Sequence, residues 1–133
     1  MLLYYCINTV RGDKMHTFNA NIPIYLQVVD EVKLKIMNGT LKPGDKIASV
    51  REMAMEMGVN PNTIQRAYAE LEREGFIRTE RAVGKYVSEN TKLIEECRYK
   101  LIRENIHQFL MQMKLLGLGK KDIMKYLEED NDE

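Results

Sequence analysis

Two short amphipathic helices with almost no chain between them constrain the fold more than any other feature of this sequence. The stretch 49–52, SVRE, is a capping box in which the serine and the glutamate each satisfy a free amide, and it predicts a helix that ends at Gly58. The pair NP at 60–61 predicts the cap and the first residue of a second helix. A connection this short that contains a glycine is typical of a helix-turn-helix. Each helix repeats apolar residues along one face, at Val50, Met53, Ala54 and Met57 and then at Ile64, Ala67, Tyr68 and Leu71.

The neighbouring segments extend this pair of helices into a winged fold. An apolar face over residues 23–39, between a proline and a glycine, predicts a preceding helix. Pro43 and Gly44 fit the central positions of a type II turn, because proline presets φ and glycine takes a positive φ. Two β-favouring runs, FIRTE and GKYVS, surround RAV within 76–88 and predict a hairpin. The predicted fold class is mainly α with a small β-hairpin, a winged helix-turn-helix over 22–88.

The second half of the chain predicts a two-helix dimerisation appendage over residues 89–127. A long apolar stripe is followed by LGLG and a short last helix. Such a helix has more apolar surface than one small domain covers, so we expect it to pack against an identical copy. The alternative is that the stripe packs on the winged domain of its own chain. An N-terminal extension is expected at 1–21 and an acidic tail at 128–133. The expected dimerisation residues are Leu93, Cys97, Leu101, Ile106, Leu110, Met113 and Leu116.

Composition argues against several classes of protein. Of the 133 residues, 30% are charged and 44% are apolar, which is typical of soluble proteins. No apolar run is long enough to span a bilayer, and the first residues lack the pattern of a secretory signal, so a cytoplasmic protein is expected. Two cysteines outside any CxxC pattern and two histidines provide no set of metal ligands. Without a Gly-rich phosphate loop or a nucleophile placed beside a histidine, we expect no cofactor and no enzyme activity.

The exposed face of the second helix carries the strongest functional signal. Its first turn and outer face offer amides, a threonine and an arginine, where a solvated helix more often shows Glu and Lys. Amides and arginine can make paired contacts to base edges in the major groove, whereas threonine and the free amides of a helix start suit phosphate. The net charge is zero, so this interpretation depends on geometry and not on a basic surface. The candidate residues are Asn60, Asn62, Thr63, Gln65 and Arg66, with Arg51 from the preceding helix.

Several motifs resemble those of one known family. PIYLQ, LKPGDKIASVREMA, GVNPNTIQRAYAELEREGFI and GKYV occur in the order and spacing of the DNA-binding domain of GntR-family bacterial transcription regulators, over about half the chain. The short helical appendage is similar to that of the YtrA subfamily. The resemblance implies a homodimer that binds a double-stranded, inverted-repeat DNA operator, often beside genes for membrane transporters. The DNA contacts that it implies are Ser49, Arg51, Asn60, Asn62, Thr63, Gln65, Arg66, Arg81 and Lys85.

Two positions depart from the family pattern. Ala48 stands where the family usually has proline, at the entry to the helix that SVRE begins. Arg81 is followed by Ala82, where the family commonly has a glycine that lets the backbone approach the minor groove. The alternative function is a winged-helix module that binds another protein and not DNA, although an aromatic or aliphatic anchor would be typical of such a face. Nothing in the sequence identifies a small-molecule effector.

Overall fold

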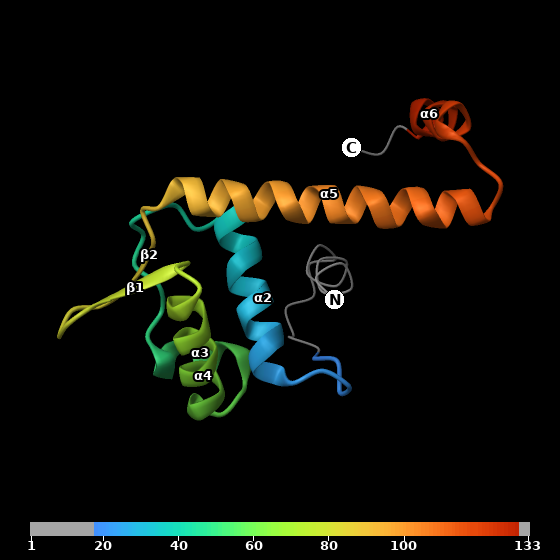
Figure 1. Cartoon of the computed structure of the whole chain (residues 1–133). Helices are drawn as coiled ribbons and strands as arrows, with labels where there is room; N and C mark the ends of the chain where they lie inside the picture. The colour runs from blue at the N-terminus through green and yellow to red at the C-terminus, as the bar shows by residue number, and fades with distance from the viewer. Residues whose placement is uncertain (1–17, 131–133) are drawn as a thin grey trace. The chain divides into compact units, whose positions relative to one another are not determined.

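The computed structural model of the protein describes residues 18–130 and builds from them five helices and a two-stranded antiparallel hairpin (Figure 1). The predicted fold class, mainly α with a small hairpin, is confirmed. The chain forms two compact units, which divide between Glu96 and Cys97 inside a long helix. The elements are α2 (Ile24–Met37), α3 (Val50–Met57), α4 (Pro61–Arg73), β1 (Ile77–Glu80), β2 (Gly84–Val87), α5 (Thr91–Leu115) and α6 (Lys120–Glu129).

Helix α2 supplies one wall of the core of the first unit. Its apolar face is buried and packs against α4, as the periodicity of 23–39 predicts. Gln27 is also buried, at 2% exposure, in the same face. Its amide nitrogen donates to the carbonyl oxygens of Asn19 and Ile22, both at 2.8 Å, and its Oε1 accepts from the Asn19 amide at 2.8 Å. Because these bonds satisfy a buried amide, they fix the turn before α2 onto the helix.

The caps of the helix-turn-helix follow the sequence closely. The Ser49 hydroxyl accepts from the Glu52 amide at 3.2 Å and donates to the Glu52 carboxylate at 3.1 Å. In a full capping box the Glu52 carboxylate would accept from the Ser49 backbone amide. Here that carboxylate accepts from the Ser49 hydroxyl instead. Gly58 ends α3 in the left-handed conformation, with φ 66° and ψ 38°, which costs glycine little. The Asn60 side chain accepts from the Asn62 amide at 2.8 Å, and a proline opens α4.

Tyr68 joins α4 to the segment that leads into α3. Its side chain is 1% exposed, in the middle of the buried face of α4. Its hydroxyl donates to the carbonyl oxygen of Ala48 at 2.8 Å. Burial, followed by the charges of Glu56 and Glu52, raises the pKa of this phenol above its ordinary value. One hydrogen bond thus fixes the entry to α3 against α4.

The hairpin pairs with a third segment that the sequence did not predict as a strand. Within the hairpin, Ile77 lies opposite Val87, and both side chains are buried. On the other edge of β2 runs the segment 44–47. The Val87 amide donates to Asp45 at 2.8 Å, and the Ile47 amide donates to Lys85 at 3.0 Å. The chain that enters α3 is therefore hydrogen-bonded directly to the wing.

Helix α5 presents its apolar residues on two faces. Leu101 and Ile106 are five residues apart, which at 3.6 residues per turn places them roughly 140° apart around the axis. Leu93, Cys97 and Leu101 share the earlier face and are half-buried. The seven predicted dimerisation residues therefore do not form one continuous stripe. The later face includes Ile106, at 45% exposure, together with Ile102, Phe109 and Met113.

The ends of the chain and α6 complete the comparison with the expected domains. Residues 1–17, most of the expected N-terminal extension, lie outside the described residues. The expected acidic tail begins inside α6, which continues to Glu129, and its last three residues are also outside the description. In α6, Ile123 is buried as the apolar pattern indicates, whereas Met124 and Leu127 are exposed.

Candidate nucleic-acid interface

The outer face of α4 is exposed and polar over its first two turns. Asn62, Gln65 and Arg66 are exposed, and Thr63 is half-buried beside them. The opposite face of α4 is fully engaged in the core, so the helix cannot rotate to present another set of side chains. Its first turn holds no acidic residue. The N-terminal end of α4 can therefore approach a polyanion without charge repulsion from its first turn, and its exposed polar side chains can form hydrogen bonds to that polyanion.

The three glutamates of the end of α4 each have a basic partner. Glu70 forms a two-bond contact with Arg73, which is the main reason that the pKa of Glu70 falls below its ordinary value. Glu72 pairs with Lys85 of the wing at 3.7 Å. The third, Glu74, pairs with a lysine of α2. These pairs reduce the repulsion that the carboxylates would exert on DNA phosphates.

Two of the predicted contact residues serve as helix caps. The oxygen of the Asn60 side chain caps α4, and the Ser49 hydroxyl is engaged with Glu52 at the start of α3. Both side chains lie at the exposed surface despite this. A direct contact to DNA is open to the amide nitrogen of Asn60, which the cap does not use.

Arg66 makes a contact with α2 that the sequence did not indicate. Its guanidinium lies over the ring of Tyr25, with 3.9 Å between the central carbon and the ring centroid. The two side chains line an open hollow of about 440 Å³ together with Pro23, Ile24, Asn62 and Thr63. None of its lining residues within 18–130 is a carboxylate. Arg66 thus belongs to a surface shared by the first turns of two helices.

The wing carries Arg81 at its tip and Lys85 on β2. Arg81 is exposed, between the two strands. Ala82 beside it has φ of 64°, a left-handed conformation that glycine adopts more easily. Lys85 donates to the Thr79 hydroxyl across the hairpin at 2.8 Å, in addition to its pair with Glu72. In this structure Lys85 therefore links the wing to α4, whereas Arg81 lies exposed at the hairpin tip.

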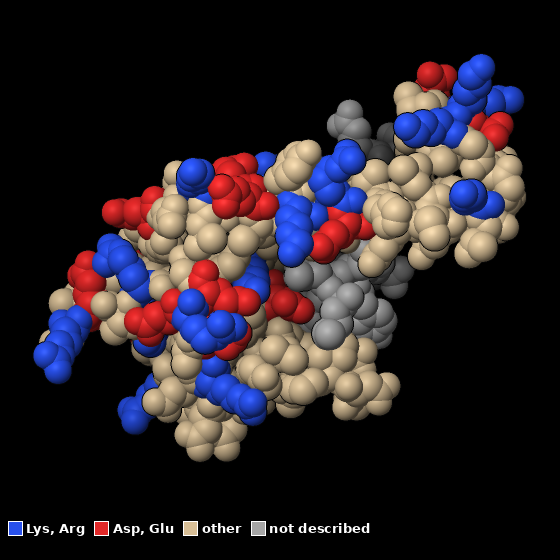
Figure 2. All heavy atoms as spheres, in the orientation of Figure 1, with Lys and Arg blue, Asp and Glu red and all other residues tan. Residues whose placement is uncertain are grey.

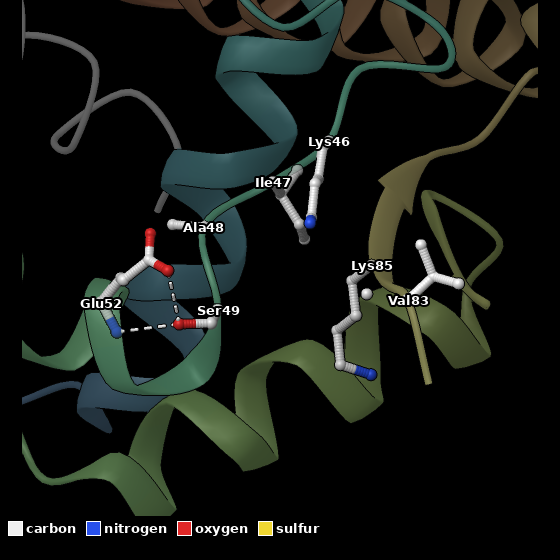
Figure 3. A pocket seen from close by; sticks show the side chains of 8 residues that line it. Lys46, Ile47, Ala48, Ser49, Glu52, Val83 and Lys85 are labelled. Carbon is white, nitrogen blue, oxygen red and sulfur yellow. Dashed lines mark hydrogen bonds between the residues drawn. The ribbon is translucent and has the colours of Figure 1, made fainter. Parts of the chain in front are cut away.

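A second hollow separates the wing from the start of α3 (Figure 3). It has a volume of about 490 Å³ and is bounded by the 46–49 segment, Glu52 and residues 83–85 of the wing. Figure 3 shows the Lys85 ammonium turned toward α4, and the Ser49 hydroxyl bonded to Glu52. Arg51 lies in the sequence between Ser49 and Glu52, which line this hollow, and it is exposed on the first turn of α3. The candidate residues thus line the exposed sides of α3, α4 and the wing.

Charges of both signs are interleaved over the visible face (Figure 2). Figure 2 shows Lys and Arg atoms scattered among Asp and Glu atoms, without one continuous basic patch on this face. This distribution agrees with the near balance of eight basic and seven acidic residues between Lys42 and Val87. Within residues 18–130, no helix has the length and apolar character needed to cross a membrane. The same residues contain no group of three His, Cys, Asp or Glu side chains arranged to hold a metal ion.

Comparison with known proteins identifies the family. Residues 24–87 match the bacterial regulatory proteins of the gntR family. Over 108 residues the chain is 44% identical to the transcriptional regulator YhcF of Bacillus subtilis. This alignment covers 81% of this chain and 89% of YhcF. The chain is 39% identical over 111 residues to the transcriptional repressor YtrA of the same species, covering 83% of this chain and 85% of YtrA. The chain belongs to the GntR family.

Solved structures of GntR proteins share the fold. A GntR-family transcriptional regulator from Listeria monocytogenes superposes with a TM-score of 0.77 at 39% identity, over 86% of this chain and 100% of that one. The DNA-binding domain of AraR in complex with an operator superposes with a TM-score of 0.53 at 25% identity, over 58% of this chain and 100% of that one. As a GntR protein, the chain is a DNA-binding transcription regulator and not an enzyme, as predicted.

Sequence reasoning about this GntR domain did not predict the contacts of three residues that organise the site. Tyr25 contacts Arg66, Gln27 fixes the turn before α2, and Tyr68 holds the entry to α3. A signal existed for Gln27, because a glutamine directly before two buried valines lies on the core face of the helix. Tyr25 and Tyr68 lie on apolar faces, where an aromatic residue predicts packing and does not identify its partner.

Proposed function

We propose that the chain is a cytoplasmic homodimeric repressor that recognises an inverted-repeat operator, each protomer placing α4 in one major groove. The observation that carries this proposal is the exposed start of α4, where Asn62, Gln65 and Arg66 face outward from a helix whose other side is locked in the core. Arg and Gln make the paired base-edge contacts that distinguish sequences. Thr63 and Asn60 at the N-terminal end of α4 suit phosphate contacts.

Exposed apolar residues of the second unit support the dimer. Ile102, Ile106 and Phe109 are 42–45% exposed on one face of α5, and Leu115 and Leu116 at its end are 88% and 72% exposed. Contiguous exposed apolar side chains are typical of protein interfaces. A second copy of the same helix offers a matching surface with two-fold symmetry. Two-fold symmetry in the protein would in turn require an inverted repeat in the operator.

The regulated genes are proposed from the family resemblance. YtrA-type regulators are often encoded beside membrane-transporter genes, so we propose an operon of that class as the target. No residue of the described chain identifies an effector. The regulator's own upstream DNA is the first operator to test.

The test is a binding titration against operator and scrambled duplexes at one stated salt concentration. Gln65→Ala or Arg66→Ala should weaken operator binding by about 1–3 kcal/mol and leave binding to scrambled duplex nearly unchanged, the range expected for a lost base contact. Thr63→Ala should weaken both duplexes alike, because a phosphate contact carries no sequence information. Gln108→Ala, an exposed glutamine of α5, is the matched control. If Gln65→Ala and Arg66→Ala both kept the wild-type ratio of operator affinity to scrambled-duplex affinity, this face of α4 would not read sequence.

A further inference from the structure

The contact between Tyr25 and Arg66 joins the first turn of α2 to the exposed face of α4. The guanidinium carbon lies 3.9 Å from the ring centroid, which is within stacking distance. Arg66 forms no ion pair with the carboxylates of residues 18–130, and Glu70, one turn further along the helix, is occupied by Arg73. Among residues 18–130, the ring of Tyr25 is therefore the side chain in direct contact that restrains this arginine.

We propose that Tyr25 is a positioning residue for DNA recognition, which holds Arg66 in the conformation that contacts the operator. This inference depends on the proposed function, because it assumes that α4 enters the groove. A guanidinium that stacks on an aromatic ring directs its N–H donors parallel to the ring and not into it. Its donors thus stay available for a base edge or a phosphate while the side chain is ordered.

The position of Tyr25 is itself fixed by the structure around it. Tyr25 is half-buried in the first turn of α2. Two residues later, Gln27 is bonded by three hydrogen bonds to the turn at Asn19–Ile22. The turn and the start of the helix therefore form one hydrogen-bonded piece, and Pro23 presets the backbone between them. A ring on such a support can restrain Arg66 because it has little freedom of its own.

The surroundings of the contact indicate that the stack persists in the complex. The hollow beside Arg66 is also lined by Asn62 and Thr63, the polar residues of the first turn of α4. The guanidinium thus lies on the same side as the groups proposed to meet the DNA, and it does not need to leave the ring to join them. An arginine that is already ordered loses less rotamer freedom when it binds.

A double-mutant cycle tests the inference. The variants are Tyr25→Leu, Tyr25→Phe, Arg66→Ala and the double variant Tyr25→Leu/Arg66→Ala, titrated against operator and scrambled duplex well below their melting temperatures. Tyr25→Leu should weaken operator binding by about two- to tenfold, which corresponds to the cost of ordering one long side chain. It should have no further effect when Arg66 is already alanine. Tyr25→Phe keeps the ring and should bind as the wild type does.

A second measurement does not depend on DNA. In the NMR spectrum of the free protein, ring current from Tyr25 should shift the Arg66 side-chain protons upfield, and Tyr25→Leu should abolish that shift while thermal unfolding shows a folded domain. Absence of the shift in the wild type would overturn the inference whatever the DNA result.

The DNA titration also separates the failure of this inference from that of the proposed function. A wild type that does not distinguish operator from scrambled duplex would refute the proposed function. Suppose that the wild type does distinguish the two duplexes, and that Tyr25→Leu weakens operator binding as much in the Arg66→Ala background as in the wild type. Tyr25 would then contact the DNA independently of Arg66, which would refute the positioning role. Tighter operator binding by Tyr25→Leu would show that the stack opposes binding, and would also refute it. An Arg66→Ala variant that binds as the wild type does would remove Arg66 from the interface and the positioning role with it.

Discussion

Removing one oxygen from Tyr68 should measurably destabilise the winged unit. In Tyr68→Phe the ring stays, but the hydrogen bond of 2.8 Å to the carbonyl oxygen of Ala48 is lost. A typical intramolecular hydrogen bond contributes about 0.5–1.5 kcal/mol, and a buried acceptor left unpaired costs about 1–3 kcal/mol. Ala48 is half-buried, so water can reach its carbonyl in part. We therefore expect a loss of about 1–1.5 kcal/mol in the free energy of unfolding.

Thermal unfolding followed by circular dichroism, at one fixed protein concentration, measures this loss. For a domain of this size, 1 kcal/mol corresponds to a change in Tm of about 4–8 °C. Tyr99→Phe is the matched control, because Tyr99 is 66% exposed and its substitution should cost less than about 0.5 kcal/mol. If Tyr68→Phe were no more destabilising than the control, the link between α4 and the entry to α3 would not contribute to stability.

The pH dependence of the same variant gives an independent check. Burial raises the pKa of Tyr68 above its ordinary value of 10, so the folded state keeps the proton when the unfolded state begins to lose it. The contribution of this group is complete below pH 10 and decreases as the pH rises further. The stability difference between the wild type and Tyr68→Phe should therefore shrink above that pH, as urea unfolding at pH 8 and above pH 10 would show. A difference that stays constant would mean that Tyr68 titrates normally.

Two further substitutions test the wing and the second unit. Ala82→Gly should stabilise the protein by about 1 kcal/mol or less, because the left-handed φ of 64° strains alanine. The gain is small because glycine loses more entropy on folding. Urea unfolding measures the change in the free energy of unfolding, and a loss of stability would contradict the strain. Ile106→Glu should weaken self-association by several kcal/mol through burial of an unpaired charge, whereas Gln108→Glu, roughly 160° away on α5, should not. Light scattering at micromolar concentration checks both, and a monomeric wild type would refute the dimer.

The parts of this fold that the sequence predicts are the parts set by neighbouring residues. Capping residues at 49 and 60 and the glycine at 58 act on the turns that contain them, so the helix ends follow from local chemistry. The pairing of 44–47 with β2 joins segments about forty residues apart, and no residue in either segment specifies the other. The same holds for Tyr25 and Arg66, whose contact depends on how α2 crosses α4.

Prediction of the candidate DNA contacts divides along the same line. Exposure of Gln65 and Arg66 follows from their position opposite the apolar face of α4, and the structure agrees. That Lys85 is engaged with Thr79 and Glu72 could not be inferred, because cross-strand register and the approach of the wing to α4 are both tertiary. The five-residue step from Leu101 to Ile106 was visible in the sequence, and counting around the helix would have separated the two faces of α5.

The pairing of 44–47 with β2 determines where the chain can change length. One residue added between 44 and 47 would reverse the inward and outward side chains of that segment and turn the buried Ile47 out of the core. It would shift the start of α3 as well. Residues 81–83 at the tip of the hairpin lie outside that pairing and are exposed. Extra residues there would lengthen the wing and leave α3 and α4 where they are. Variants with extra residues at the hairpin tip would therefore differ in the length of the wing and keep the same exposed face of α4.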